Sequence, residues 1–158
     1  MLRFSRTVPA PADLGLDVIA VPEGADMQLD VRLESVLEGV VVSGTVRVPL
    51  AGECVRCLEP ITDRIEAEFA ELFVNPGSDG DDETLWIEAD AVDLDPVLRD
   101  AVVLALPLQP VCEPDCPGLC PECGARLADE PGHGHEVTDS RWAALEQLAV
   151  RDRDGQDR

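Results

Sequence analysis

The sequence predicts an α+β fold, in which an antiparallel β-meander is covered by one helix and followed by a small C-terminal module. Three observations support this fold class. Apolar residues alternate with polar ones at a period of two through much of residues 28–74, which is typical of half-buried strands. One apolar stripe at helical spacing follows at 96–106. Both histidines and four of the six cysteines lie within residues 112–135.

The N-terminal residues carry turn signals before the first expected strand. Residues 1–13 contain prolines, which favour turns over strands. The apolar run at 16–21 predicts one short strand that ends at Pro22-Glu23-Gly24. We therefore expect an irregular start to the chain.

Three longer strands are expected next, joined into the meander. From Gln28 to Leu33 apolar residues alternate with polar ones. The return strand runs from Val40 to Leu50, and Gly44 in its middle predicts a bulge or a close approach of two backbones. The third strand, 61–74, follows a turn that contains Cys54-Val-Arg-Cys57. A metal ion bound at this turn would fix the register of the sheet.

One helix is expected to cover the sheet. Asp95 is a suitable N-cap residue, and Pro96 fits the first helical position, where its missing N–H costs nothing. The apolar stripe continues until Pro107, which cannot continue a helix. The helix at about 96–106 therefore returns the chain toward the Cys54 turn.

Three further segments are expected outside these elements. Residues 75–83 form an acidic loop whose carboxylates lack the spacing of a calcium-binding EF-hand, and 85–87 form a short strand. A final helix begins at Asp139 and runs to about Arg151.

The spacing of cysteine and histidine predicts two structural zinc sites. Cys120-Pro-Glu-Cys123-Gly is typical of a zinc knuckle, in which a tight turn directs two thiolates at one point and the glycine can adopt a positive φ. His-x-His follows and completes a tetrahedral set. The remaining four cysteines supply a second set, so that eight ligands serve two closed sites. The sets are Cys54, Cys57, Cys112 and Cys116 for the first zinc, and Cys120, Cys123, His133 and His135 for the second.

A redox dithiol is the alternative interpretation of each Cys-x-x-Cys pair. Such a dithiol belongs in a βαβ context at a helix N-terminus, which neither pair has. A catalytic zinc keeps an open position for water, whereas four protein ligands leave none. Phosphate loops and hydrolase nucleophile motifs are absent from the sequence. We therefore expect a protein that is not an enzyme and has no small-molecule substrate, with a thiol redox protein or an RNA-processing enzyme as the alternative.

The charge of the chain restricts its partners. The net charge is -21, and all twelve basic residues are arginines. Such acidity repels a phosphate backbone, so extensive direct contact with nucleic acid is disfavoured, whereas a basic protein would be attracted. Solubility alone is the simpler explanation of this charge. No apolar run approaches the roughly 20 residues of a membrane span, and no signal peptide is present, so we expect a cytoplasmic protein with reduced thiols.

Three stretches in order carry a resemblance to a known family: Cys54-Val-Arg-Cys57-Leu, then LRDAVVLALP at 98–107 running into Val111-Cys112, then Gly118-Leu-Cys-Pro-Glu-Cys-Gly124. They resemble the YceD family of bacterial and plastid large-subunit ribosomal RNA accumulation proteins. The resemblance extends from about residue 7 to 150, and the N-terminal TVPAPADLGLDVIAVPEG is similar to actinobacterial members.

The resemblance implies a role in the synthesis, processing or stability of large-subunit ribosomal RNA, and it offers no catalytic residues. Some relatives that are similar to this chain at the Cys120/Cys123 knuckle end in Cys-x-Cys, where this chain has His133-Gly-His135 and so keeps two zinc-competent ligands. We expect a ribosome-assembly protein that joins a large-subunit precursor through a basic ribosomal protein or through ribosomal RNA. Direct RNA contact would need a local basic patch near the metals, for which the candidates are Arg56, Arg64 and Arg126.

The expected domain organisation follows from these elements. Residues 1–111 would form the sheet and its helix, and residues 112–158 would form the zinc-binding module, docked on the Cys54/Cys57 hairpin.

Overall fold

The structure is a computed structural model that describes residues 1–77 and 84–135. The helix expected from Asp139 and most of the acidic loop at 75–83 lie outside the described residues. The chain divides into two compact units, Met1–Cys116 and Pro117–Arg158. The segment that carries Cys112 and Cys116 belongs to the first unit.

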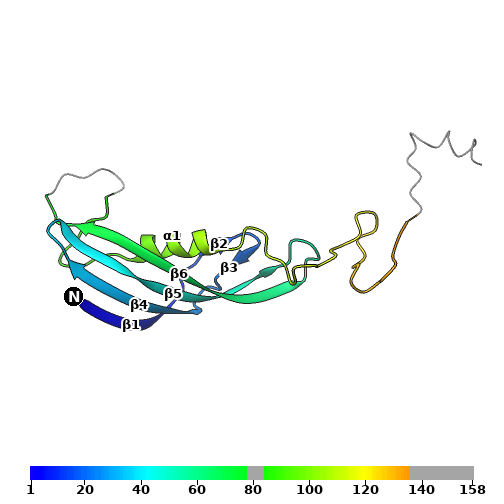
Figure 1. The fold of residues 1–158 in the computed structure, drawn as a ribbon, viewed down its shortest axis with the longest axis horizontal. Helices are drawn as coiled ribbons and strands as arrows, with labels where there is room; N and C mark the ends of the chain where they lie inside the picture. The colour runs from blue at the N-terminus through cyan, green and yellow to red at the C-terminus, as the bar shows by residue number, and fades with distance from the viewer. Residues whose placement is uncertain (78–83, 136–158) are drawn as a thin grey trace, which may run out of the picture. The chain divides into compact units, whose positions relative to one another are not determined.

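The first unit contains the sheet and the helix, and the α+β fold class is confirmed (Figure 1). No helix in the described part of the chain is long and apolar enough to span a bilayer. In chain order the elements are β1 (Leu2–Pro9), β2 (Gly15–Leu16), β3 (Ile19–Ala20), β4 (Asp26–Ser35), β5 (Gly39–Glu53), β6 (Pro60–Val74) and α1 (Asp95–Ala105).

The meander of β4, β5 and β6 forms the body of the sheet. β5 pairs antiparallel with β4 on one side and with β6 on the other. On the same side as β4, the last residues of β5 pair with β3. The β5–β6 register runs unbroken from Gly39↔Val74 to Glu53↔Pro60, so the expected bulge at Gly44 is absent. The close backbone approach is present instead, because a Cβ on Gly44 would lie 2.1 Å from the carbonyl oxygen of Asp30.

The N-terminal prediction was wrong, because the chain begins with a strand. β1 pairs with β4 along its whole length, with half-buried Phe4 and Val8 toward the core and exposed Arg3 and Ser5 on the other face. An edge strand tolerates a proline at its end, and Pro9 is the last residue of β1.

Two further strand predictions need correction. The single strand expected at 16–21 is a tight hairpin of β2 and β3. The strand expected at 85–87 is an isolated parallel bridge between Val74 and Trp86.

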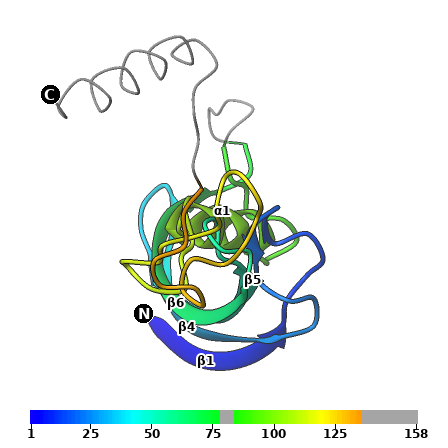
Figure 2. The same cartoon turned by 90° about the vertical axis from the view of Figure 1, so that its right-hand side faces the viewer.

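The helix covers the sheet as expected. In Figure 2 the strands curl around α1, and Val97, Leu98 and Val102 of α1 are buried in the aliphatic core. The N-cap prediction was wrong by one residue: Leu94 is the N-cap residue, and Asp95 is the first residue of the helix. The Asp93 carboxylate accepts the N–H of Asp95 at 3.0 Å.

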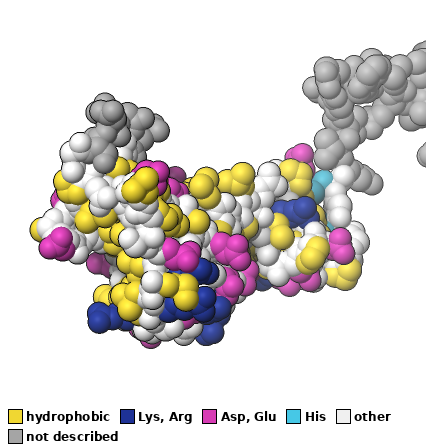
Figure 3. Space-filling view, turned by 60° about the vertical axis from the view of Figure 1, so that its left-hand side comes forward, with side chains coloured by type: hydrophobic (Ala, Val, Ile, Leu, Met, Phe, Trp, Pro, Cys, Tyr) yellow, Lys and Arg dark blue, Asp and Glu magenta, His cyan; other side chains and the backbone are white. Residues whose placement is uncertain are grey.

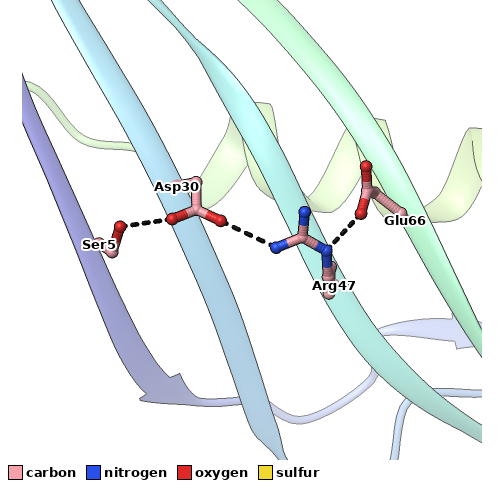
Figure 4. Close-up of polar contacts among 4 residues, drawn as sticks. All are labelled: Ser5, Asp30, Arg47 and Glu66. Carbon is pink, nitrogen blue, oxygen red and sulfur yellow. Dashed lines mark hydrogen bonds and ion pairs between the residues drawn. The ribbon is translucent and has the colours of Figure 1, made fainter.

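A polar ladder crosses the outer face of the sheet from β1 to β6 (Figure 4). Asp30 accepts hydrogen bonds from the hydroxyl of Ser5 and, at 2.8 Å, from Arg47, which also pairs with Glu66. The Ser5 hydroxyl and then the Arg47 guanidinium lower the pKa of Asp30. These side chains are about half exposed, so the ladder contributes little to stability.

Candidate metal centres

The first cluster joins two segments of the first unit that are far apart in sequence. Cys54 and Cys57 lie on the β5–β6 connection, and Cys112 and Cys116 lie after α1. The Sγ atoms of Cys54 and Cys116 are 3.9 Å apart, and those of Cys57 and Cys112 are 3.6 Å apart. A tetrahedral zinc with bonds of about 2.3 Å would hold sulfur atoms about 3.8 Å apart. The four thiols therefore fit one metal ion.

Burial also favours a structural metal in the first cluster. Cys54, Cys57 and Cys116 are buried against Ile61 and Val111, and only Cys112 is exposed. All four are free thiols rather than disulfides. Polar groups gathered in an apolar setting need partners, and one cation shared by the four sulfur atoms would supply them.

Arg56 holds the two halves of the first cluster together. Its guanidinium donates to the carbonyl oxygens of Pro114 at 3.3 Å and Cys116 at 3.0 Å. The neighbouring Val55 N–H donates to the carbonyl of Pro110 at 2.9 Å. Arg56 was a candidate for a basic patch that contacts RNA, and no spacing pattern in the sequence signals this positioning contact.

The second cluster lies within the second unit and combines two thiols with two imidazoles. Cys123 Sγ lies 3.3 Å from Nε2 of His133 and 3.3 Å from Nε2 of His135. The two Nε2 atoms are 3.0 Å apart, and Cys120 completes the group. Ideal zinc bonds of about 2.0–2.3 Å would place such ligand atoms about 3.3–3.8 Å apart. The group is slightly tighter than that and fits a single metal ion.

Glu130 supports the second cluster from behind. Its carboxylate lies 2.7 Å from Nδ1 of His133, the ring nitrogen that faces away from the cluster. A carboxylate in this position fixes the tautomer that leaves Nε2 free to bind a metal, and it raises the basicity of the ring. Glu130 was not among the residues predicted from the sequence, although an acidic residue three positions before a ligand histidine is a usable signal.

The two Cys-x-x-Cys turns have the same backbone hydrogen bonds. Leu58 N–H donates to the carbonyl of Cys54 at 2.9 Å, and Gly124 N–H donates to that of Cys120 at 2.8 Å. The first cysteine of each turn donates to the residue five positions later, at 2.8 Å in both turns. Both turns are therefore knuckles of the same geometry.

Each cluster favours one thiolate before any metal binds. Burial raises the pKa of Cys54, but backbone N–H groups of Cys112 and Cys57 outweigh it and lower that pKa to about 6. Backbone N–H groups of Cys123 and Glu122 lower the pKa of Cys120 to about 6.

Cys112 of the first cluster holds its proton more tightly than an ordinary thiol does. The neighbouring Cys116 thiol and then burial raise the pKa of Cys112 to about 12. That proton has to leave before Cys112 can coordinate a cation, so metal uptake releases protons and tightens as the pH rises.

The structure thus brings the eight candidate ligands into the two quartets paired from spacing. Each quartet has four protein ligands, which is the donor number of a closed structural site. Of the other two arginines considered for a basic patch, Arg126 pairs with Asp129 at 3.5 Å, and Arg64 lies on β6 opposite Pro49.

Comparison with known proteins places both quartets inside a recognised sequence region. A family model described as large ribosomal RNA subunit accumulation protein YceD matches residues 42–149. An uncharacterized protein of Mycobacterium tuberculosis is 49% identical over 153 residues, which cover 94% of this chain and 74% of the relative. An uncharacterized protein of Mycobacterium leprae is 39% identical over 157 residues, covering 96% and 72%.

A plant relative has a name that describes a role. The chloroplastic large ribosomal RNA subunit accumulation protein YCED homolog 1 of Zea mays is 29% identical over 118 residues, which cover 54% of this chain and 40% of the relative. No solved structure matches the chain.

Proposed function

Because the chain belongs to the YceD family of large ribosomal RNA subunit accumulation proteins, we propose that it promotes accumulation of that RNA as a non-enzymatic ribosome-assembly protein stabilised by two zinc ions. The observation that carries this proposal is the pair of four-ligand clusters within the matched region. Closed sites of this kind stabilise a fold rather than activate water. The metals would shape a binding surface.

Zinc is the metal that the donor sets favour. Four thiolates at tetrahedral separations suit zinc or iron, whereas a set of two thiolates and two imidazoles is typical of zinc. The first ion would join the β5–β6 connection to the segment after α1. The second would support the described part of the second unit, because few apolar side chains are buried among residues 117–135.

The binding mode follows from the charge. At a net charge of -21 the chain attracts basic proteins and repels RNA phosphates. We therefore propose that it joins a cytoplasmic precursor of the large subunit chiefly through a basic ribosomal protein.

Sedimentation tests the proposal most directly. The tagged protein should co-sediment with large-subunit precursors in a sucrose gradient, and its depletion should lower the ratio of large-subunit to small-subunit RNA. The purified zinc-loaded protein should neither reduce a disulfide substrate nor cleave precursor RNA. Turnover in either assay, lost on changing a residue outside the metal clusters, would instead establish an enzyme.

A further inference from the structure

Among the residues that the structure describes, no strand pairs with the outer edge of β6 along Glu68–Leu72. On its other side β6 pairs with β5 throughout, and at its end Val74 forms the bridge to Trp86. In that bridge Val74 N–H donates to Leu85 at 2.8 Å, and its carbonyl accepts from Ile87 at 3.0 Å. Both backbone polar groups of Val74 therefore point away from β5.

The backbone N–H and C=O groups of alternate residues before Val74 point to the same side as those of Val74. Alternate residues of a strand point their N–H and C=O groups to the same side, so those of Leu72, Ala70 and Glu68 also face the open edge. Among residues 1–77 and 84–135 these groups have no hydrogen-bond partner. The edge is thus available to another strand, and the chain itself uses it in this way at Val74.

A cleft of about 610 Å³ lies along this edge, between β6 and α1. Its β6 wall is made of consecutive residues, Glu68 to Glu71. Because successive side chains point to opposite faces of a sheet, a cleft lined by all of them faces the edge itself. The α1 wall presents Val97, Ala101 and Leu104, and Leu104 is 86% exposed.

The charges around the cleft are all of one sign. Glu68, Glu71 and Asp100 line it, and no arginine of the described residues does. Within the described part of the chain none of these three carboxylates forms an ion pair. On the face drawn in Figure 3, acidic and apolar side chains of the first unit lie next to one another in the upper part, and its arginines gather mostly in the lower part. The cleft suits an occupant with apolar and cationic side chains.

A second copy of the chain is a poor occupant. Pairing two β6 edges would bring Glu68 and Glu71 of both copies together, and like charges on neighbouring strands repel. An acidic edge of this kind resists self-association while it attracts a basic strand.

We propose that an extended, basic segment of a partner protein adds as a strand to β6 at Glu68–Leu72, in the cleft beside α1. Backbone hydrogen bonds to the open edge would supply affinity, and pairing of cations with the three carboxylates would supply selectivity. This inference rests on the proposed function, for which it identifies the surface that takes the basic partner.

A fluorescent seven-residue peptide of alternating arginine and valine is the probe, measured by anisotropy with the zinc-loaded full chain. The native protein should bind it, with affinity that falls as salt is added. Ala70→Pro removes an edge N–H and places a ring in the path of the peptide, and should weaken binding at least about tenfold. Neutralising the cleft with Glu68→Gln, Glu71→Gln and Asp100→Asn together should weaken it similarly.

Two matched controls isolate the site. Thr62→Pro removes a backbone N–H from the same edge of β6 but outside the cleft, and this variant should bind the peptide as the native protein does. Asp17→Asn, Glu23→Gln and Glu38→Gln together remove the same charge from exposed positions elsewhere, and should also bind normally. Circular dichroism and zinc content would establish that each variant is folded.

Several results would overturn the inference. Failure of the native protein to bind the arginine–valine peptide would contradict it. So would a loss of affinity in the control variants as large as that in Ala70→Pro, or equal binding of an aspartate–valine peptide. Preferential binding of single-stranded RNA at this edge, or a dimer that Ala70→Pro dissociates, would show a different occupant. Co-sedimentation separates this failure from failure of the proposed function. If the native protein and Ala70→Pro join large-subunit precursors equally well while the peptide does not bind, the cleft inference fails and the function stands.

Discussion

Leu58 and Gly124 occupy equivalent left-handed positions, each one residue after the second cysteine of its knuckle. Their φ angles are 61° and 74°. Glycine adopts this conformation freely, whereas a leucine is strained there. The side chain of Leu58 is 59% exposed, so the core does not account for its presence. The first knuckle therefore carries a strain that the second avoids.

Replacing the strained residue should stabilise the first unit. Leu58→Gly removes about 1–2 kcal/mol of left-handed strain and adds about 0.5–1 kcal/mol of chain entropy, so a net gain of about 0.5 kcal/mol is expected. Urea unfolding of the zinc-loaded protein measures it. Gly124→Ala is the reciprocal control and should weaken the second site, although a Cβ there would meet no atom within 4 Å. A clear loss of stability in Leu58→Gly would show that the leucine makes a contact of its own.

The two clusters should lose their metals independently. Cys54→Ser should release one zinc and lower the free energy of unfolding of the first unit by about 3 kcal/mol or more, since a structural metal contributes directly to folding. His135→Ala should release the other zinc and leave the sheet folded. Native mass spectrometry and circular dichroism of each variant check both results. Release of the same metal by both substitutions would contradict the assignment of ligands to sites.

Glu130 should tune the second site without binding the metal. Glu130→Gln weakens the acceptor of the His133 Nδ1–H, and should reduce zinc affinity about ten- to hundredfold. Competition with a chromophoric chelator gives the affinity. Glu122→Gln removes the same charge from within the Cys120/Cys123 knuckle, where the side chain makes no contact with the histidines. The zinc affinity of this control variant should therefore equal that of the native protein.

Arg56 should act through position rather than charge. Arg56→Ala removes both hydrogen bonds to the segment after α1, and should lower the stability of the zinc-loaded first unit by about 1 kcal/mol. Both carbonyls accept from the same guanidinium nitrogen, Nη1. Arg56→Lys keeps the charge, but its ammonium is more strongly hydrated and lacks the planar group that fixes this nitrogen in place, so it should be weakened as well. Arg64→Ala is the control. Full stability of Arg56→Lys in urea would show that charge alone matters.

Pattern and spacing predicted the parts of the fold that bury an apolar face regularly. β4, β5, β6 and α1 follow from their periodicity, because each buries a continuous face. β1 was missed because only Phe4 and Val8 mark its inner face, and because Pro9 at its end and Pro11 just after it suggested turns. The hairpin of β2 and β3 is too short for any period to appear.

Spacing also grouped the candidate metal ligands, because knuckles hold their cysteines close in sequence. It did not reveal Arg56 and Glu130 as supporting residues, since their contacts depend on the folded path of the chain. The open edge of β6 could not be predicted from the sequence either, because an edge is defined by which strands pair and not by the sequence of the strand itself.

Zinc content measures the central claim most directly. Protein purified without added metal would be analysed by native mass spectrometry beside elemental analysis. Two zinc ions per chain are expected, one for each cluster. One ion or none in the folded, reduced protein would contradict the two-site account, and it would favour a dithiol role for the cysteines left without metal.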